Sequence, residues 1–253
     1  MTKVLYGIGV ALLLGWCGAA VLLERSHVPA VAPPAPAEHT CSTVAQPLGS
    51  AAVSYAAIVK RVAVAYRRPG GVRISRFGRL NPNGFPTVFS IVGRRRTRGC
   101  ATAWYRVQLP VRPNGTTGWV RAGAVQVAPV RTRIVIRVRA KRLELLREGH
   151  VVFRAPISTG GSATPTPTGR FYVKERLVPT DPSGPWGPAA LGISAFSPVL
   201  KRWAQGGPIG IHGTNEPWSI GHSVSNGCIR LDNHVIGRLF AATPAGTPVI
   251  IKP

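Results

Sequence analysis

Two short segments, Ile211-His212-Gly213-Thr214 and Ser225-Asn226-Gly227-Cys228-Ile229-Arg230-Leu231, carry most of the information in this chain. They bring a histidine close in sequence to the single cysteine of the C-terminal half, among glycines that let backbone approach a ligand closely. A cysteine attacks a carbonyl carbon only as the thiolate, so it needs a neighbouring base or a cationic pocket. The segments therefore predict that Cys228 is a nucleophile and that His212 is its general base.

The residues beside Cys228 suit the same chemistry. Gly227 leaves room for a substrate carbonyl next to the sulfur, and backbone N–H groups around Cys228 are candidate donors to an oxyanion. Arg230 adds a positive charge for a carboxylate or for developing negative charge. Taken alone, a cysteine in a β-rich protein is more often inert packing, and a histidine more often an ordinary core or surface group. The combination with the flanking glycines favours chemistry.

The two segments resemble the signature of the L,D-transpeptidase catalytic domain (YkuD-type) family. In that family a histidine precedes a Ser/Thr-x-Gly-Cys-Ile/Val-Arg block by a dozen or so residues. Here the twelve residues 213 to 224 separate His212 from Ser225. The resemblance implies that Cys228 is the nucleophile, that His212 acts as general base and later as general acid, and that the backbone carbonyl of Gly213 orients the imidazole.

One position departs from the family pattern. Asn226 stands where many members carry a second histidine; it keeps a hydrogen-bond donor but cannot titrate, so no acid-base role is available there. His222 is expected to be a bystander. Trp186 and Trp218 either line a substrate groove or are plain packing. The residues expected to bind substrate are Ser225, Asn226, Gly227, Arg230 and Trp218.

The resemblance implies acyl transfer on peptidoglycan stem tetrapeptides. Cys228 attacks the carbonyl of the third residue, expels the terminal D-alanine and forms a thioester, which the side-chain amine of a neighbouring stem resolves to a 3→3 crosslink. No cofactor or metal is needed. The same site with water as acceptor is an L,D-carboxypeptidase. The motif is also compatible with a catalytically inactive wall-binding protein and with a sortase-like or cysteine-peptidase enzyme.

Composition favours a mainly β protein and excludes other mechanisms. The chain of 253 residues holds 29 Gly and 24 Pro, with short apolar runs and no long amphipathic helical pattern. We therefore expect a small barrel followed by a β-sandwich-like catalytic domain. The few carboxylates after Val130 show no paired motif of the glycosidase kind, and neither H-E-x-x-H nor C-x-x-C occurs.

The charge balance indicates an anionic partner. The chain has 32 basic against 8 acidic residues, a formal net charge of +24. It lacks zinc-finger spacing, an aromatic-rich RNA motif and a basic recognition helix, so anionic cell-wall polymer is favoured over nucleic acid. The protein is expected to act as a monomer.

The N-terminal segment is predicted to direct the protein out of the cytoplasm. Residues 1–27 contain twenty uncharged residues, 4 to 23, between Lys3 and Glu24. That length is sufficient to span a bilayer, which favours an uncleaved membrane anchor over a cleaved signal peptide. Residues 28–39 are Pro/Ala-rich and form a semi-rigid linker. The body is then expected at the periplasmic or cell-wall face, membrane-anchored or secreted.

Residues 40–128 are predicted to form a separate β domain. Short apolar runs alternate with turn residues, and the Trp104-Tyr105-Arg106-Val107 and Gly118-Trp119-Val120 segments resemble bacterial SH3-like barrels. This domain either grips wall polymer or only positions the catalytic domain. Cys41 and Cys100 bracket it, and in an exported protein they are expected to form a disulfide, which leaves Cys228 free.

Residues 130–253 are predicted to be the catalytic domain. The alternating segment from Arg133 to Arg139 predicts an edge or half-buried strand, and Glu148-Gly149-His150 predicts a hairpin turn. Ser158-Thr159-Gly160 and Thr166-Pro167-Thr168-Gly169 resemble architectural segments of the family. Residues 178–190 are expected to form a loop over the cleft.

Overall fold

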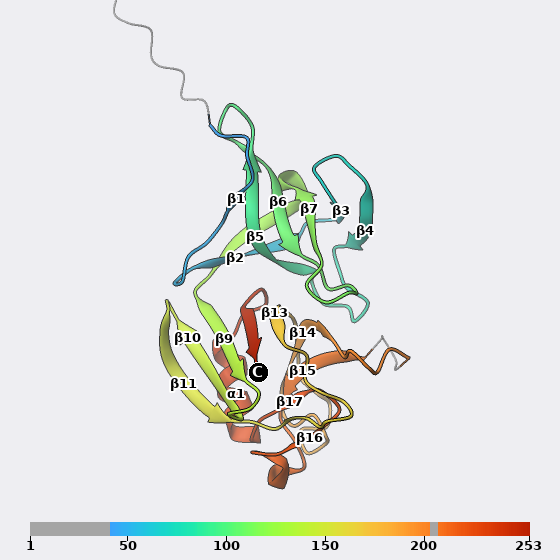
Figure 1. Ribbon diagram of the computed structural model, residues 1–253, viewed down its shortest axis with the longest axis vertical. Coiled ribbons are helices and arrows are strands. Elements are labelled where there is room, and N and C mark those ends of the chain that lie inside the picture. The colour runs from blue at the N-terminus through green and yellow to red at the C-terminus, as the bar shows by residue number, and fades with distance from the viewer. Residues whose placement is uncertain (1–40, 203–206) are drawn as a thin grey trace, which may run out of the picture. The chain divides into compact units, whose positions relative to one another are not determined.

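The computed structural model describes residues 41–202 and 207–253. Residues 39–253 form one compact unit, and the described residues are mainly β, as the sequence predicts (Figure 1). The predicted N-terminal anchor and the Pro/Ala-rich linker lie outside the described residues. Within those residues, none of the helices is long and apolar enough to cross a bilayer.

The first part of the described chain forms an eight-stranded sheet in the order β4-β3-β7-β6-β5-β2-β8, with β1 paired to β5 off this path. Its inward-facing residues, among them Phe89, Val107 and Val120, form a hydrophobic cluster of their own. The elements are β1 (Gln46–Pro47), β2 (Ser54–Val59), β3 (Val62–Tyr66), β4 (Arg73–Gly78), β5 (Val88–Arg96), β6 (Thr102–Gln108), β7 (Thr117–Arg121), the 3-10 helix η1 (Ala122–Ala124) and β8 (Val125–Val130). The SH3-like assignment of this region and the predicted domain boundaries stay predictions.

Two details of this sheet bear on the sequence predictions. Strand β5 continues past Gly93 to Arg96, with a register shift against β6 between Ile91 and Gly93. This shift indicates a β-bulge beside Gly93, where the sequence changes from apolar residues to arginines. Cys41 and Cys100 form the expected disulfide.

The second part of the chain forms an eight-stranded sheet in the order β11-β10-β9-β18-β13-β14-β15-β17, and β12 pairs with β16 in a small parallel sheet. Side chains from both halves of the large sheet, such as Leu143 and Ile211, meet in one core, which is sandwich-like packing. The elements are β9 (Thr132–Arg137), β10 (Arg142–Arg147), β11 (His150–Pro156), β12 (Thr159–Gly160), β13 (Gly169–Leu177), β14 (Ala190–Phe196), β15 (Pro208–His212), η3 (Pro217–Ser219), β16 (Ser223–Ser225), β17 (Ile229–Arg230), α1 (Asn233–Ala242) and β18 (Pro248–Lys252).

The prediction that the segment after Arg133 is an edge or half-buried strand is wrong. β9 lies between β10 and β18, and Ile134, Val135 and Ile136 are all buried. Alternation along the sequence does not reveal the parallel partner β18, which comes from the far end of the chain. The hairpin between β10 and β11 is confirmed, and Glu148 and Gly149 at its turn both have positive φ.

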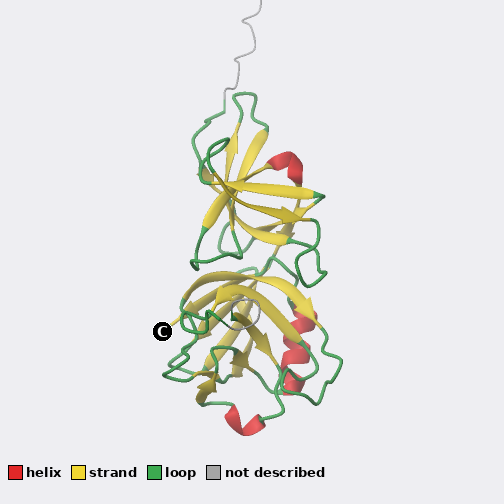
Figure 2. Ribbon diagram, turned by 90° about the vertical axis from the view of Figure 1, so that its right-hand side faces the viewer, coloured by secondary structure: helices red, strands yellow, loops and turns green. Residues whose placement is uncertain are grey.

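One helix, α1, closes the core beside the large sheet (Figure 2). Asp232 caps it, since its side chain accepts from the N–H of His234. Ile236 and Leu239 are buried, while the opposite side of the helix faces solvent. At ten residues it is too short to stand out as a long amphipathic run in the sequence.

Candidate active site

The pairing of β15 with β17 places His212 and Cys228 on one face of the sheet. The strands are parallel, with Ile211 opposite Ile229 and His212 opposite Arg230. Cys228 comes directly before β17, opposite Gly210, whose N–H donates to Cys228 Sγ at 3.4 Å. Gly210 and His212 are two apart on β15 and so face the same side of the sheet. The side chain of His212 therefore lies on the same face as the sulfur of Cys228.

The backbone fixes the tautomer and orientation of His212. Its Nδ1 lies 2.6 Å from the carbonyl oxygen of Gly213. A carbonyl can only accept, so Nδ1 carries the proton and Nε2 keeps a free lone pair. The other edge of the ring borders Gly210, because a methyl group built there would lie 3.8 Å from His212 Cδ2. Nε2 is therefore the basic nitrogen, on the ring edge that borders Gly210, the residue whose N–H donates to Cys228 Sγ.

Gly213 has a second, steric role. A Cβ at this position would collide with the Oδ1 atom of Asn233 and come within 2.9 Å of Gly187 Cα. Asn233 Oδ1 accepts from the N–H of Thr214 at 2.8 Å, which ties the end of β15 to the start of α1. The segment after His212 is thereby held between α1 and the 178–189 loop.

Burial controls the protonation of both groups. It lowers the pKa of His212 from 6.5 to about 4; the hydrogen bond to Gly213 opposes this and the charge of Arg230 adds to it. Burial also raises the pKa of the Cys228 thiol, although the Gly210 N–H and Arg230 both favour the thiolate. At neutral pH the pair thus rests as a neutral imidazole beside a protonated thiol.

Arg230 is paired inside the protein. Its guanidinium forms a salt bridge with the carboxylate of Glu216, and the arginine side chain is 20% exposed. Glu216 is held in turn by its N–H, which donates to Thr214 Oγ1 at 2.9 Å. The positive charge of Arg230 acts to lower the pKa of both His212 and Cys228. A substrate carboxylate would have to compete with Glu216 for the guanidinium.

The loop that carries Cys228 is fastened by hydroxyl groups. Ser225 Oγ donates to the carbonyl of Cys228 at 2.6 Å and accepts from the N–H of Gly227 at 3.1 Å. Thr166 Oγ1 donates to the carbonyl of Gly227 at 2.9 Å and accepts from the N–H of Gly160 at 2.8 Å. The hydroxyl of Ser225, which is buried, is therefore engaged within its own loop.

Glycine is required at position 227 by its backbone conformation and by packing against Ile209. Its φ is +108°, and a Cβ there would lie 3.0 Å from Ile209 Cδ1. Its N–H is already given to Ser225, so it is not a donor to an oxyanion. Asn226, beside it, is exposed.

Of the two tryptophans that the sequence offers as groove residues, Trp186 contacts His212, which with Cys228 forms the pair termed the dyad. Its ring centroid lies 4.7 Å from that of His212, and the residue is 49% exposed. Trp218 is 64% exposed in η3, and within the described residues no ring contact joins it to His212. The 178–189 segment is irregular, as expected, and brings Trp186 to the histidine.

A cavity of about 380 Å³ adjoins the dyad, bordered by Trp186 and Gly210. Its wall includes Glu175, which is buried and accepts from the side-chain amides of Asn81 and Asn83 and pairs with Lys174. The remaining lining residues are Leu177, Val178, Pro179, Thr180, Ala190, Gly192, Pro208 and Ile209.

Sequence reasoning missed Glu216, Asn233, Glu175 and the role of Thr166. The T-P-x-G resemblance marked Thr166 as architectural without showing what it holds, and Asp232-Asn233 ahead of an apolar 3,4-spaced pattern was an available helix-start signal. The two side-chain amides that donate to Glu175 come from residues more than ninety positions away, so no local pattern reveals these contacts. Within the described residues, no three His, Cys, Asp or Glu side chains are grouped to hold a metal ion.

Comparison with known proteins gives consistent matches. The family model of the L,D-transpeptidase catalytic domain (YkuD) matches residues 131–251. The chain is 39% identical to the YkuD protein of Bacillus subtilis over 119 residues, which is 47% of this chain and 65% of that one. It is 34% identical to the YkuD protein of Bacillus licheniformis over 152 residues, 57% of this chain and 84% of that one. A solved L,D-transpeptidase from Mycobacterium smegmatis is 18% identical, with a TM-score of 0.40 and coverage of 60% of this chain and 78% of that one.

Proposed function

Because this chain belongs to the L,D-transpeptidase catalytic domain (YkuD) family, we propose that it is a cysteine-dependent L,D-transpeptidase that forms 3→3 crosslinks in peptidoglycan. The observation that carries this proposal is the shared neighbour Gly210. Its N–H donates to Cys228 Sγ, and the His212 ring edge that is not bonded to Gly213 borders the same residue. A thiol and an oriented basic nitrogen on one sheet face are what acyl transfer through a thioester requires.

The neutral resting pair determines the order of proton movement. Cys228 attacks the carbonyl carbon of the third stem residue while its proton passes to His212 Nε2. The tetrahedral intermediate then collapses, the bond to the terminal D-alanine breaks, and the imidazolium returns that proton to the leaving amine. A side-chain amine from a second stem then attacks the thioester and loses a proton to His212. The carbon–sulfur bond breaks, and the imidazolium returns that proton to the Cys228 sulfur, which restores the neutral pair.

Several features of the site support these steps. The carbonyl of Gly213 stabilises the imidazolium as it forms, since that bond favours the charged ring. Arg230 opposes the imidazolium but favours the thiolate, and its pairing with Glu216 tempers both effects. The cavity beside Trp186 is the proposed site for a stem peptide.

Mass spectrometry after incubation with a carbapenem tests the nucleophile. We expect one covalent adduct on Cys228 of the full chain, and no adduct on Cys228→Ala. Incubation with purified tetrapeptide-containing muropeptides should give 3→3 dimers with the wild type and none with the variant. Retained acylation or crosslinking in Cys228→Ala would refute the assignment.

The same assays separate this activity from its competitors. A carboxypeptidase would release D-alanine without dimers, and a binding protein would show neither adduct nor product. A sortase-like enzyme would be labelled at Cys228 but leave the muropeptides unchanged. We further propose that the protein acts on the outer side of the cytoplasmic membrane, held by its N-terminal segment, as a monomer.

A further inference from the structure

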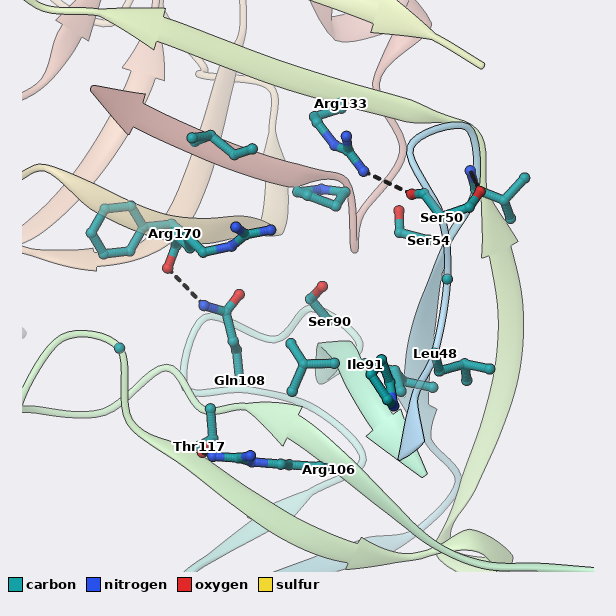
Figure 3. Close-up of a pocket in the computed structure, with 18 residues that line it drawn as sticks. Leu48, Ser50, Ser54, Ser90, Ile91, Arg106, Gln108, Thr117, Arg133 and Arg170 are labelled. Carbon is teal, nitrogen blue, oxygen red and sulfur yellow. Dashed lines mark hydrogen bonds between the residues drawn. The ribbon is translucent and has the colours of Figure 1, made fainter. Parts of the chain in front are cut away.

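A second cavity, of about 670 Å³, is lined by neither residue of the dyad. Residues of β5, β6 and β7 lie on one side of it and residues of β9, β13 and β18 on the other. Figure 3 shows Arg133 and Arg170 on one side, facing Gln108, Ser90 and Thr117 across the space.

Three arginines from three different strands line this cavity: Arg106, Arg133 and Arg170. Arg106 donates to Thr117 Oγ1 at 3.1 and 3.2 Å, and Arg133 donates to the carbonyl of Ser50 at 3.1 Å. Both contacts are to neutral oxygens and leave the charges uncompensated. Arg133 Nε is buried and has no acceptor among the described residues.

The lining holds no carboxylate among the described residues, and none of the three arginines forms a salt bridge there. This differs from Arg230, which has Glu216, and from Arg137, Arg142 and Arg154, which share Glu144. Unpaired guanidinium groups gathered around one cavity favour an anionic ligand, because each can offer two parallel N–H donors to phosphate or carboxylate oxygens.

The other residues that line the cavity indicate the chemistry of the ligand between its anionic groups. The hydroxyls of Ser90 and Thr117 and the amide of Gln108 lie between the arginines, and Gln108 already donates to the carbonyl of Arg170 at 2.7 Å. Such neutral polar groups suit hydroxyls and ether oxygens of a ligand. The one aromatic residue of the wall, Phe171, is only 2% exposed, so it offers no surface on which a nucleobase could stack.

We propose that this cavity binds a segment of a phosphodiester-linked polyol, a linear polyanion without bases. The arginines bind the phosphates, and the hydroxyl and amide groups bind the polyol between them. The site would hold the protein on a phosphate-rich polymer while the dyad acts elsewhere, and its existence does not depend on the proposed chemistry of Cys228.

The test measures binding of a synthetic glycerol-phosphate hexamer to the full chain by isothermal titration calorimetry. Arg106→Gln/Arg170→Gln should weaken binding at least about tenfold and flatten its salt dependence, since two phosphate contacts are lost. The matched control is Arg73→Gln/Arg139→Gln, which removes the same charge from two exposed arginines outside the cavity. The control should change affinity less than about threefold. Both variants should keep wild-type labelling of Cys228 by a carbapenem, which reports on folding.

Binding of two other polyanions, hexathymidylate and hexaglutamate, is measured in the same way to identify the class of ligand. Weaker binding of both than of the glycerol-phosphate hexamer supports a site for a phosphodiester polyol. Equal binding of hexathymidylate would indicate a nucleic-acid site, and equal binding of hexaglutamate would indicate attraction by charge alone; either overturns the proposal. So does an equal loss of affinity in the two double variants, or a wild type that does not bind the hexamer.

Discussion

At the scale of single residues, the two nitrogens of His212 have different functions. Nδ1 is committed to the carbonyl of Gly213, so the ring cannot flip without losing a 2.6 Å hydrogen bond. Nε2 keeps a free lone pair, and in the proposed mechanism it is this nitrogen that exchanges a proton with the sulfur. A backbone carbonyl here takes the place of the acidic third member found in many triads.

Replacing His212 by alanine should slow acylation of Cys228 by a carbapenem by about 10²–10⁴-fold, the usual effect of removing a general base. Stopped-flow measurement of the acylation rate checks this. His222→Ala is the matched control, because His222 is exposed and, among the described residues, it forms its hydrogen bonds through its backbone N–H and carbonyl. A loss smaller than tenfold in His212→Ala would count against its role as base.

The lowered pKa of His212 also predicts how stability depends on pH. Between pH 6.5 and about 4 the unfolded chain protonates this histidine and the folded chain does not. The free energy of unfolding should therefore fall as the pH drops through that window, by roughly 3 kcal/mol from this residue. Urea unfolding at several pH values should show a smaller fall in His212→Gln than in the wild type. Identical slopes in the two proteins would contradict the prediction.

At the scale of elements, the strand pair β15 and β17 positions the dyad, and the segment around β12 fastens the loop before β17. Thr166 links Gly160 in β12 to Gly227 in the cysteine loop with a single buried hydroxyl. Thr164 Oγ1 and the N–H of Gly161 both donate to the carbonyl of Ser225. The segments that resemble the family's S-T-G and T-P-x-G patterns thus hold the loop that carries Cys228 in place.

Thr166→Val should reduce both stability and activity. The change leaves a buried N–H and a buried carbonyl without their partner, which costs about 2 kcal/mol or more of unfolding free energy. Loosening the loop should slow carbapenem acylation about tenfold or more, since small displacements of a nucleophile have large effects. Thr168→Val, at an exposed threonine in the same segment, should change neither quantity in urea unfolding or stopped-flow assays. Equal effects of the two substitutions would exclude this role for Thr166.

At the scale of the whole molecule, the loops that connect β4 to β5 and β6 to β7 contact β13 and β14 of the second sheet. Asn83 and the buried Glu175 both line the cavity beside Trp186, and Asn114 exchanges two hydrogen bonds with the backbone of Phe196 in β14. The N-terminal region thereby borders the proposed peptide site, and its two predicted roles, to grip wall polymer or only to position the catalytic domain, stay predictions.

The disulfide should matter for stability and not for chemistry. Cys41 and Cys100 are separated by 59 positions, so closing that loop is expected to contribute about 4 kcal/mol through the entropy of the unfolded chain. Cys41→Ser/Cys100→Ser should lower the urea midpoint, while carbapenem labelling of Cys228 proceeds at the wild-type rate. A reducing agent should shift the midpoint of the wild type and leave that of the variant unchanged. A variant as stable as the wild type would contradict the prediction.

The sequence by itself determined the mainly β fold, the β10–β11 hairpin and the pairing of Cys41 with Cys100, and it singled out His212 and Cys228 as the catalytic pair, a role that stays a prediction. The disulfide follows from the number of cysteines expected outside the cytoplasm. The other features depend on residue type and short-range spacing: alternation predicts strands, turn residues predict hairpins, and a histidine with a glycine-flanked cysteine predicts a thiol site. Only the tertiary structure decided that β9 is an interior strand, that Trp186 rather than Trp218 contacts His212, and that Arg230 is paired with Glu216. It alone also gathered Arg106, Arg133 and Arg170 around one cavity. Such contacts join residues far apart in the chain, and they depend on the order of strands in the sheets, which local patterns do not record.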